Sequence, residues 1–179
     1  IAAQNGHVEV VRALCRANAD PNKVSDKGEL CGVAPIWRAA AGGHYESVLQ
    51  FYEVHGDINS ADQKGRTPLW MAVARGKDYG NGALVDWLCK ARANVDQATR
   101  DGVTPLWLAS HQGALEFVQL LCWAGADKDK GTLHNATPLY IASQMRHLEV
   151  VAFLCEARAD IDKVEHHGAC PLHIVAHQA

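Results

Sequence analysis

Thr104-Pro105-Leu106-Trp107 is the motif that decides the fold, because it recurs at a near-fixed spacing. It stands again at Thr67-Pro68-Leu69-Trp70 and Thr137-Pro138-Leu139-Tyr140, with weaker copies at Ala34-Pro35-Ile36-Trp37 and Cys170-Pro171-Leu172-His173. The prolines of the five copies are separated by steps of 33, 37, 33 and 33 residues. A period of this size indicates a stacked repeat array.

Residues 99–131 show how one period is expected to fold. The first five residues are polar and include a turn glycine, which predicts a loop. Thr104 can cap free backbone amides and Pro105 suits the first helical position, so the pair predicts a helix, which ends at Gly113. Glu116 opens a second helix, because its negative charge suits the positive end of the helix dipole. Helices this short need neighbours to be stable in water.

The repeating residues resemble the ankyrin repeat, with its Gly-x-Thr-Pro-Leu-His-x-Ala-Ala and Gly-His-x-Glu-Val-Val segments. The resemblance is carried by Gly6-His7-Val8-Glu9-Val10-Val11, by residues 62–69 and by His147-Leu148-Glu149-Val150-Val151. It implies an all-α repeat solenoid, in which helix-turn-helix units stack and β-hairpin fingers project from them.

The repeat register predicts the boundaries of a single array over residues 1–179. We expect a half repeat at 1–24, full repeats at 25–61, 62–98, 99–131 and 132–164, and a half repeat at 165–179. Both ends fall inside a first helix and leave apolar faces uncapped, so we expect the array to continue at both ends.

Some positions depart from the family pattern. Aromatic residues replace the histidine that follows Pro-Leu, and we expect them to pack between repeats: Trp37, Trp70, Trp107 and Tyr140. Other residues replace the closing glycine, and a left-handed backbone there costs about 1 kcal/mol each: Asn18, His55, Arg92 and Arg158. Ala34 and Cys170 lack the capping hydroxyl of threonine, so their helices are expected to start less firmly.

Two four-residue insertions interrupt the period. The first, at residues 29–33, lengthens a finger and is expected to expose Leu30 and Val33. It is either a contact point for a partner or, as we favour, a surface insertion that costs little. The second, at residues 77–82, contains Asn-Gly and predicts a turn between two helices.

The resemblance also implies where a partner lies, because ankyrin proteins bind along the concave face of fingers and first helices. The candidate binding residues on this face are mostly basic residues and histidines: Lys27, Lys64, Arg66, Arg75, Arg100, His111, His134, Met145, His166 and His167. Such a stripe favours an acidic or phosphorylated peptide. The alternative is that these side chains are ordinary solvated surface.

Two tryptophans on second helices allow further alternatives. Trp87 falls in a core slot and is expected to pack there. Trp123 falls at a slot that is usually polar, so it is either a contact residue or an ordinary exposed aromatic.

No catalytic or cofactor motif is present, so we expect neither an enzyme nor a bound cofactor. There is no nucleophile elbow, phosphate-cradling loop or dinucleotide fingerprint. His173 and His177 have the i, i+4 spacing of some zinc sites, together with Cys170 nearby. The repeat register already explains these positions, so we expect no metal. The formal glycosylation sequon at Asn135 is discounted because Thr137 is a helix cap.

The cysteines indicate a reducing compartment. Four of the six occupy the same slot of the repeat: Cys15, Cys89, Cys122 and Cys155. Equivalent slots of packed helices lie about 8–10 Å apart, whereas a disulfide needs Cα atoms within about 7 Å. We therefore expect four small buried apolar side chains without disulfides.

The sequence thus predicts a protein-interaction module of 179 residues that binds a protein or peptide without turnover. The net charge of -3 counts against a nucleic-acid partner. No apolar run spans a membrane and no signal peptide is visible, so we expect a monomeric array in the cytoplasm. The alternatives are an accessory targeting or regulatory segment of a larger enzyme or channel, and a structural spacer.

Overall fold

The computed structural model describes residues 2–25, 32–76 and 81–176, and these residues form ten helices and no strand. The chain divides into two compact units, residues 1–94 and 95–179. The boundary falls inside the predicted repeat 62–98, and the single array over 1–179 stays a prediction. Parts of both insertions lie outside the described residues, as do Lys27, Leu30 and His177.

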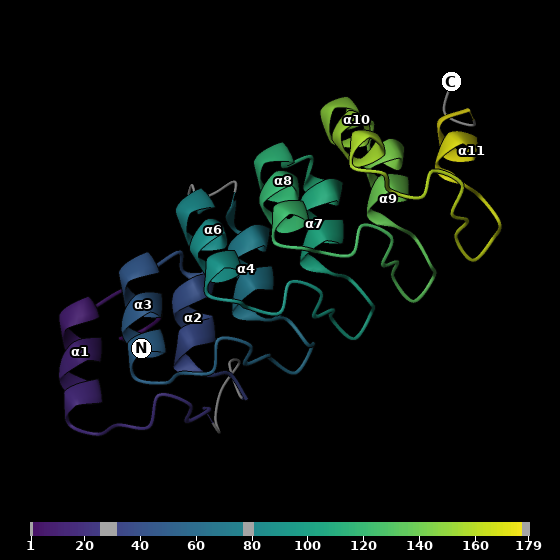
Figure 1. Cartoon of the computed structure of the whole chain (residues 1–179). Coiled ribbons are helices and arrows are strands. Elements are labelled where there is room, and N and C mark those ends of the chain that lie inside the picture. Colours follow the sequence, from purple (N-terminus) through teal and green to yellow (C-terminus); the bar gives the residue numbers. More distant parts are fainter. Residues whose placement is uncertain (1, 26–31, 77–80, 177–179) are drawn as a thin grey trace. The chain divides into compact units, whose positions relative to one another are not determined.

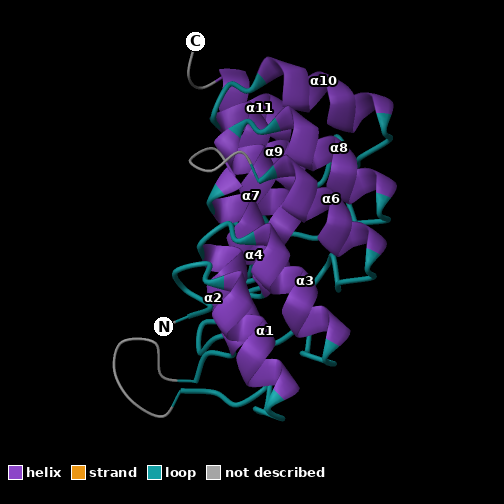
Figure 2. Cartoon of the chain, turned by 90° about the vertical axis from the view of Figure 1, so that its left-hand side faces the viewer, coloured by secondary structure: helices purple, strands orange, loops and turns teal. Residues whose placement is uncertain are grey.

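Each unit has two layers of helices, which Figures 1 and 2 show. In the first unit, the first helices α2 (Pro35–Ala41) and α4 (Pro68–Ala74) pack on each other, and the second helix α3 (Tyr45–Glu53) contacts α2. Helix α1 (Val8–Arg16) packs on α3, and α6 (Gly82–Lys90) packs on α4.

The second unit repeats this arrangement. Its first helices α7 (Pro105–Gln112), α9 (Pro138–Gln144) and α11 (Pro171–Ala176) contact one another in that order. The second helices α8 (Leu115–Trp123) and α10 (Leu148–Glu156) pack on α7 and α9 and on each other. The expected helix pair of residues 99–131 is confirmed, including the end of α7 at Gly113.

The predicted helix starts are confirmed by the caps. In Thr67, Thr104 and Thr137 the side-chain oxygen accepts a hydrogen bond from the amide three residues later, at 3.1 Å in each case. Ala34 makes no such bond at the start of α2. At Cys170 the thiol sulfur instead lies 3.0 Å from an imidazole nitrogen, Nδ1 of His173.

The closing positions of the second helices take the expected left-handed backbone. The φ angles are 60° at Asn18, 64° at His55, 61° at Arg92 and 62° at Arg158. Arg146 also has a φ of 60°, which the sequence analysis did not anticipate. It stands just after a first helix, α9, at the position where Gly113 ends the first helix of the preceding repeat. Left-handed residues other than glycine thus occur in both units.

The fingers are short hydrogen-bonded loops. No strand forms in the described part of the chain. In the loop 62–66, Asp62 N donates to Arg66 O at 3.0 Å and Gly65 N donates to Asp62 O at 2.9 Å. The loops 99–103, 132–136 and 165–169 have the same pair of bonds. We call these four segments finger loops.

Side-chain oxygens at the bases of the loops join successive repeats. Asn22 Oδ1 accepts from Asp57 N at 2.7 Å, and Asn59 Oδ1 accepts from Asn94 N at 2.8 Å. In the second unit, Asp127 N and Asp160 N donate to the carboxylates of Asp96 and Asp129 at 3.0 and 2.8 Å. Each repeat thereby satisfies an amide of the next one.

The core lies between the two helix layers of each unit. It contains leucines that are almost fully buried, including Leu69 and Leu88 in the first unit and Leu106, Leu121, Leu139 and Leu154 in the second. No helix in the described ranges has the length and apolar character needed to span a membrane.

Candidate functional site

The first unit has a pocket of about 410 Å³ on the face formed by its finger loop and first helices. We call it the arginine pocket. Its principal lining residues are Trp37, Arg38, Ala41, Arg66, Met71 and Arg75. They come from α2, the 62–66 loop and α4 with its C-cap residue. The structure therefore brings together two predicted binding residues, Arg66 and Arg75, and adds Arg38, which the sequence analysis missed.

Arg66 is held in place by the finger loop that carries it. Its Nε donates to Asp62 Oδ2 at 2.7 Å, and its backbone amide donates to Asp62 Oδ1 at 2.9 Å. The Asp62 side chain is only 6% exposed, and the two groups form an ion pair. The guanidinium carbon lies 5.5 Å from the Trp37 ring centroid and 5.9 Å from that of Trp70. Both contacts are cation–π geometry.

The floor of the pocket is apolar. Val33, Trp37 and Met71 form a buried cluster against which Ala41 and Trp70 pack. This confirms the expected packing between repeats for two of the aromatic residues in the histidine slot, Trp37 and Trp70. Trp37 Nε1 also donates to Arg66 O at 2.7 Å, which ties α2 to the next finger loop. The expected exposure of Val33 is wrong, because its side chain is only 5% exposed and contributes to this cluster.

Lys64 and Arg75 are the exposed cations of this face. Lys64 lies at the tip of the 62–66 loop, where its backbone amide donates to Asp62 Oδ1 at 2.9 Å. Arg75 is the C-cap residue of α4. A cation there is favoured by the negative end of the helix dipole. Arg100 is also exposed, at the 99–103 loop of the second unit.

The second unit presents imidazoles rather than a cluster of arginines. His134 and His166 lie at neighbouring finger loops with ring centroids 6.2 Å apart, and His167 is 5.5 Å from His166. His166 N donates to His134 O at 2.8 Å, which fixes the two loops side by side. This edge of the second unit therefore carries imidazole rings where the 62–66 loop of the first unit carries Arg66.

The remaining predicted residues of the second unit lie on its first helices. His111 is exposed and stacks on Trp107 with ring centroids 5.4 Å apart and an interplanar angle of 11°. Its carbonyl oxygen accepts a hydrogen bond from His147 Nε2 at 2.9 Å. Met145 follows α9 and is 41% exposed.

The family comparison fits this architecture. A profile of ankyrin repeats, described as three copies, matches residues 1–97 and 77–165. The chain belongs to the ankyrin repeat family. No curated protein matches the chain. Ankyrin repeats are generally protein–protein interaction modules and are typically not catalytic.

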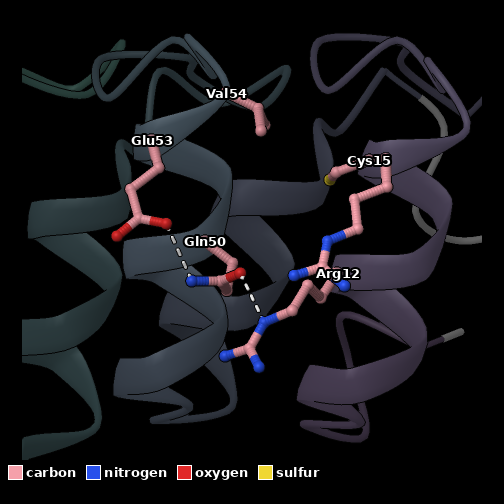
Figure 3. A pocket seen from close by; sticks show the side chains of 6 residues that line it. Arg12, Cys15, Gln50, Glu53 and Val54 are labelled. Atoms are coloured by element: carbon pink, nitrogen blue, oxygen red, sulfur yellow. Dashed lines mark hydrogen bonds between the residues drawn. The ribbon is translucent and has the colours of Figure 1, made fainter.

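A second pocket of this ankyrin protein lies between α1 and α3, on the second-helix layer (Figure 3). It measures about 380 Å³ and is lined by Arg12, Cys15, Arg16, Gln50, Glu53 and Val54. Arg12 Nε donates to Gln50 Oε1 at 3.0 Å, and Gln50 Nε2 donates to Glu53 Oε2 at 2.9 Å. The lining carries charges of both signs. In the sequence, this pocket is indicated by the i, i+4 spacing of Arg12 and Arg16, which places both arginines on one helix face.

The cysteines of the ankyrin chain show little sign of thiolate chemistry. Burial, reinforced by Asp86, raises the pKa of Cys89 to about 11. Burial also raises the pKa of Cys122 to about 11, and it raises the pKa of Cys15. The expected burial of the four cysteines is wrong, because Cys15, Cys89 and Cys122 are only half-buried and Cys155 is exposed. The five cysteines in the described ranges are not in disulfides.

The tail histidines form no metal site within the described ranges of the ankyrin chain. In these ranges no three His, Cys, Asp or Glu side chains are arranged so that they could hold a metal ion. Glu165 Oε1 accepts from His167 N at 2.9 Å and from Ala169 N at 3.3 Å. The first of these bonds is the main reason why the pKa of the Glu165 carboxyl lies below its usual value.

The two singled-out tryptophans differ in exposure. Trp87 packs edge-on against Tyr45 and Tyr52 at centroid distances of 6.3 and 5.2 Å, which confirms its packing role. Trp123 is 73% exposed on α8. Asn135 belongs to the discounted glycosylation sequon. Its side-chain amide donates a hydrogen bond to Val164 O at 2.6 Å.

Proposed function

We propose that this chain is a protein-interaction module that binds an acidic segment of a partner protein along its finger loops and first helices, without turnover. The observation that carries the proposal is the arginine pocket. It places Arg66 and Arg75 beside Arg38, on the face that the family resemblance implies for binding.

The charge of this face supports an acidic partner. Lys64 and Arg75 are exposed, and no acidic side chain lines the arginine pocket in the part of the chain that the structure describes. Clustered charge of one sign attracts the opposite sign and speeds association, and it disfavours like-charged partners. This selectivity arises although the whole chain carries a net charge of -3.

The rigidity of the face supports recognition without a large ordering cost. Arg66 is already fixed by Asp62 and by the Trp37 ring, so binding immobilises little that is mobile beforehand. Pre-organised side chains leave more of the contact free energy available for affinity.

The test is a selection of acidic and neutral peptides from a display library against the whole chain, followed by titration of the enriched peptides. The variant Lys64→Gln with Arg75→Gln removes two exposed charges from the face. We expect enriched peptides to be acidic and their affinity to fall about two- to fivefold for each exposed charge removed.

The matched control is Arg16→Gln. Arg16, like Arg75, is an exposed arginine at the C-terminal end of a helix, but it lies on the second-helix layer. Both changes therefore remove the same favourable charge from a helix end. Enrichment of neutral peptides, or an equal loss in the control, would contradict the proposal.

A further inference from the structure

We propose that the arginine pocket is a subsite for a phosphate group on the bound partner segment, so that phosphorylation of the segment strengthens binding. The inference rests on the proposed function and adds the chemical group that enters the pocket. It starts from three arginines that lie on separate elements and line one cavity: Arg38 on α2, Arg66 on the finger loop and Arg75 after α4.

Guanidinium groups are suited to this ligand. Each has five N–H donors in a planar fork that matches two phosphate oxygens at once. The Asp62 carboxylate engages Nε and one terminal nitrogen of Arg66, so it orients the fork and uses only part of it. A cavity of about 410 Å³ has room for a phosphate group together with the side chain that carries it.

The positive charge of the lining favours phosphate over a single carboxylate. Three arginines line the cavity, and Asp62 orients one of them, Arg66. A phosphorylated side chain carries about -1.5 to -2 charge at pH 7, whereas a glutamate carries one negative charge. The buried Trp37 and Met71 beneath the arginines reduce the access of water and thereby strengthen the attraction.

The cluster is not a requirement of the repeat. In repeat register the positions of Arg38, Arg66 and Arg75 correspond to Leu108, Ala136 and Met145 of the second unit. The second unit folds with apolar residues there, so the arginines are not needed to build the helices. The pocket of Figure 3 also contains two arginines, but Glu53 lines it from α3, beyond Gln50, and its negative charge opposes an anion.

The experiment uses three capped peptides of the form Gly-Gly-X-Gly-Gly, with phosphoserine, glutamate or serine at X. The reporter is the indole N–H signal of Trp37 in a ¹⁵N spectrum of the whole chain. The Trp87 and Trp123 signals serve as internal references, because neither side chain lines the pocket. We expect the phosphoserine peptide to shift the Trp37 signal saturably in the millimolar range, the glutamate peptide more weakly and the serine peptide not at all.

Arg75→Gln should weaken the phosphoserine peptide about tenfold, because one charge-assisted contact is lost. Arg75→Lys keeps the charge but not the fork, so an intermediate affinity is expected. Arg16→Gln should bind as the unmodified chain does. Arg66 is left intact in these variants because it holds the finger loop.

The inference is overturned if the Trp37 signal does not move, or if Arg16→Gln weakens the peptide as much as Arg75→Gln. It is also overturned if glutamate and phosphoserine bind equally. These outcomes leave the proposed function standing as long as display-selected acidic peptides still bind through Lys64 and Arg75. Failure of both experiments removes both proposals.

Discussion

The first helices of the first unit pack on each other with the same backbone arrangement as those of the second unit. The residues at the two contacts differ in chemistry. In the first unit this contact is lined by Arg38, Arg66 and Arg75, and in the second unit the same register positions hold Leu108, Ala136 and Met145. Threonine caps start both helices of the second contact, whereas in the first contact only α4 has one, because Ala34 precedes α2. The difference shows that the scaffold residues fix the layers, whereas a few variable positions set the chemistry of the surface.

The largest expected effect of a single change comes from Asp62→Ala. It removes the carboxylate that accepts bonds from Lys64 N, Arg66 N and Arg66 Nε, and it leaves a half-buried guanidinium without its ion pair. We expect the free energy of unfolding of the first unit to fall by about 2–3 kcal/mol.

The matched change in the second unit is Thr99→Ala, which removes one acceptor for Val103 N. Its cost should be about 1 kcal/mol. Urea titration followed through the tryptophan indole signals of each unit measures both values. Equal losses would mean that the Asp62–Arg66 pair adds nothing to the finger loop.

A second experiment moves the arginine chemistry to the other unit. Thr132→Asp, Ala136→Arg and Met145→Arg together place in the second unit the residue types that stand at positions 62, 66 and 75. We expect this variant to bind the phosphoserine peptide at the second unit at least about tenfold more tightly than the unmodified second unit does.

The Trp107 indole signal is the reporter, and the same variant with Met145→Gln in place of Met145→Arg is the control. If the Trp107 signal is as insensitive as in the unmodified chain, the chemistry of the first unit depends on more than these register positions.

A smaller effect tests whether the two scaffolds are alike. Arg92→Gly and Arg158→Gly relieve a left-handed backbone at equivalent positions of the two units. Each should raise the free energy of unfolding by about 0.5–1 kcal/mol, the strain relief being partly offset by the flexibility of glycine in the unfolded chain. Thermal melts of both variants provide the measurement. A gain in one unit only would show that the closing turns are not equivalent.

The smallest effect is a pH dependence confined to the second unit. The folded chain holds the Glu165 carboxyl below its usual pKa. This contribution to stability is therefore present above the unfolded-state pKa and is lost as the pH falls through the folded-state pKa. Glu165→Gln should remove that part of the acid dependence. Side-chain carboxyl signals recorded against pH should place the titration of Glu165 below the value for an unfolded peptide, and a higher value would refute the expectation.

The sequence predicted the scaffold well because the scaffold depends on local chemistry. Thr-Pro pairs specify helix starts, and the positions of Asn18, His55, Arg92 and Arg158 specify left-handed turns from register alone. The β-hairpin fingers that the resemblance implies are not resolved as strands, because each described finger loop closes with two backbone bonds over five residues.

The site was only partly predictable, because it depends on how long side chains meet across repeats. The sequence singled out Arg66 and Arg75, which line the arginine pocket, but not Arg38, which lines it with them. Its signal was available, since the same slot holds Met71, Leu108 and Ile141 in the other full repeats, and a charge among apolar residues stands out. Val33 was misjudged because an inserted residue was assumed to face water, whereas it packs against Trp37.

The hydrogen bonds that Asn22, Asn59, Asp96 and Asp129 accept are each selective on one side only. One repeat supplies a particular side chain, and the next supplies a backbone amide, which every residue except proline possesses. In the second unit the next repeat adds a side-chain bond of its own, from Lys130 to Asp96 O and from Lys163 to Asp129 O. The amide bonds therefore tolerate changes in the residue that donates, whereas the lysine bonds tie the joints of the second unit to a particular side chain in the next repeat.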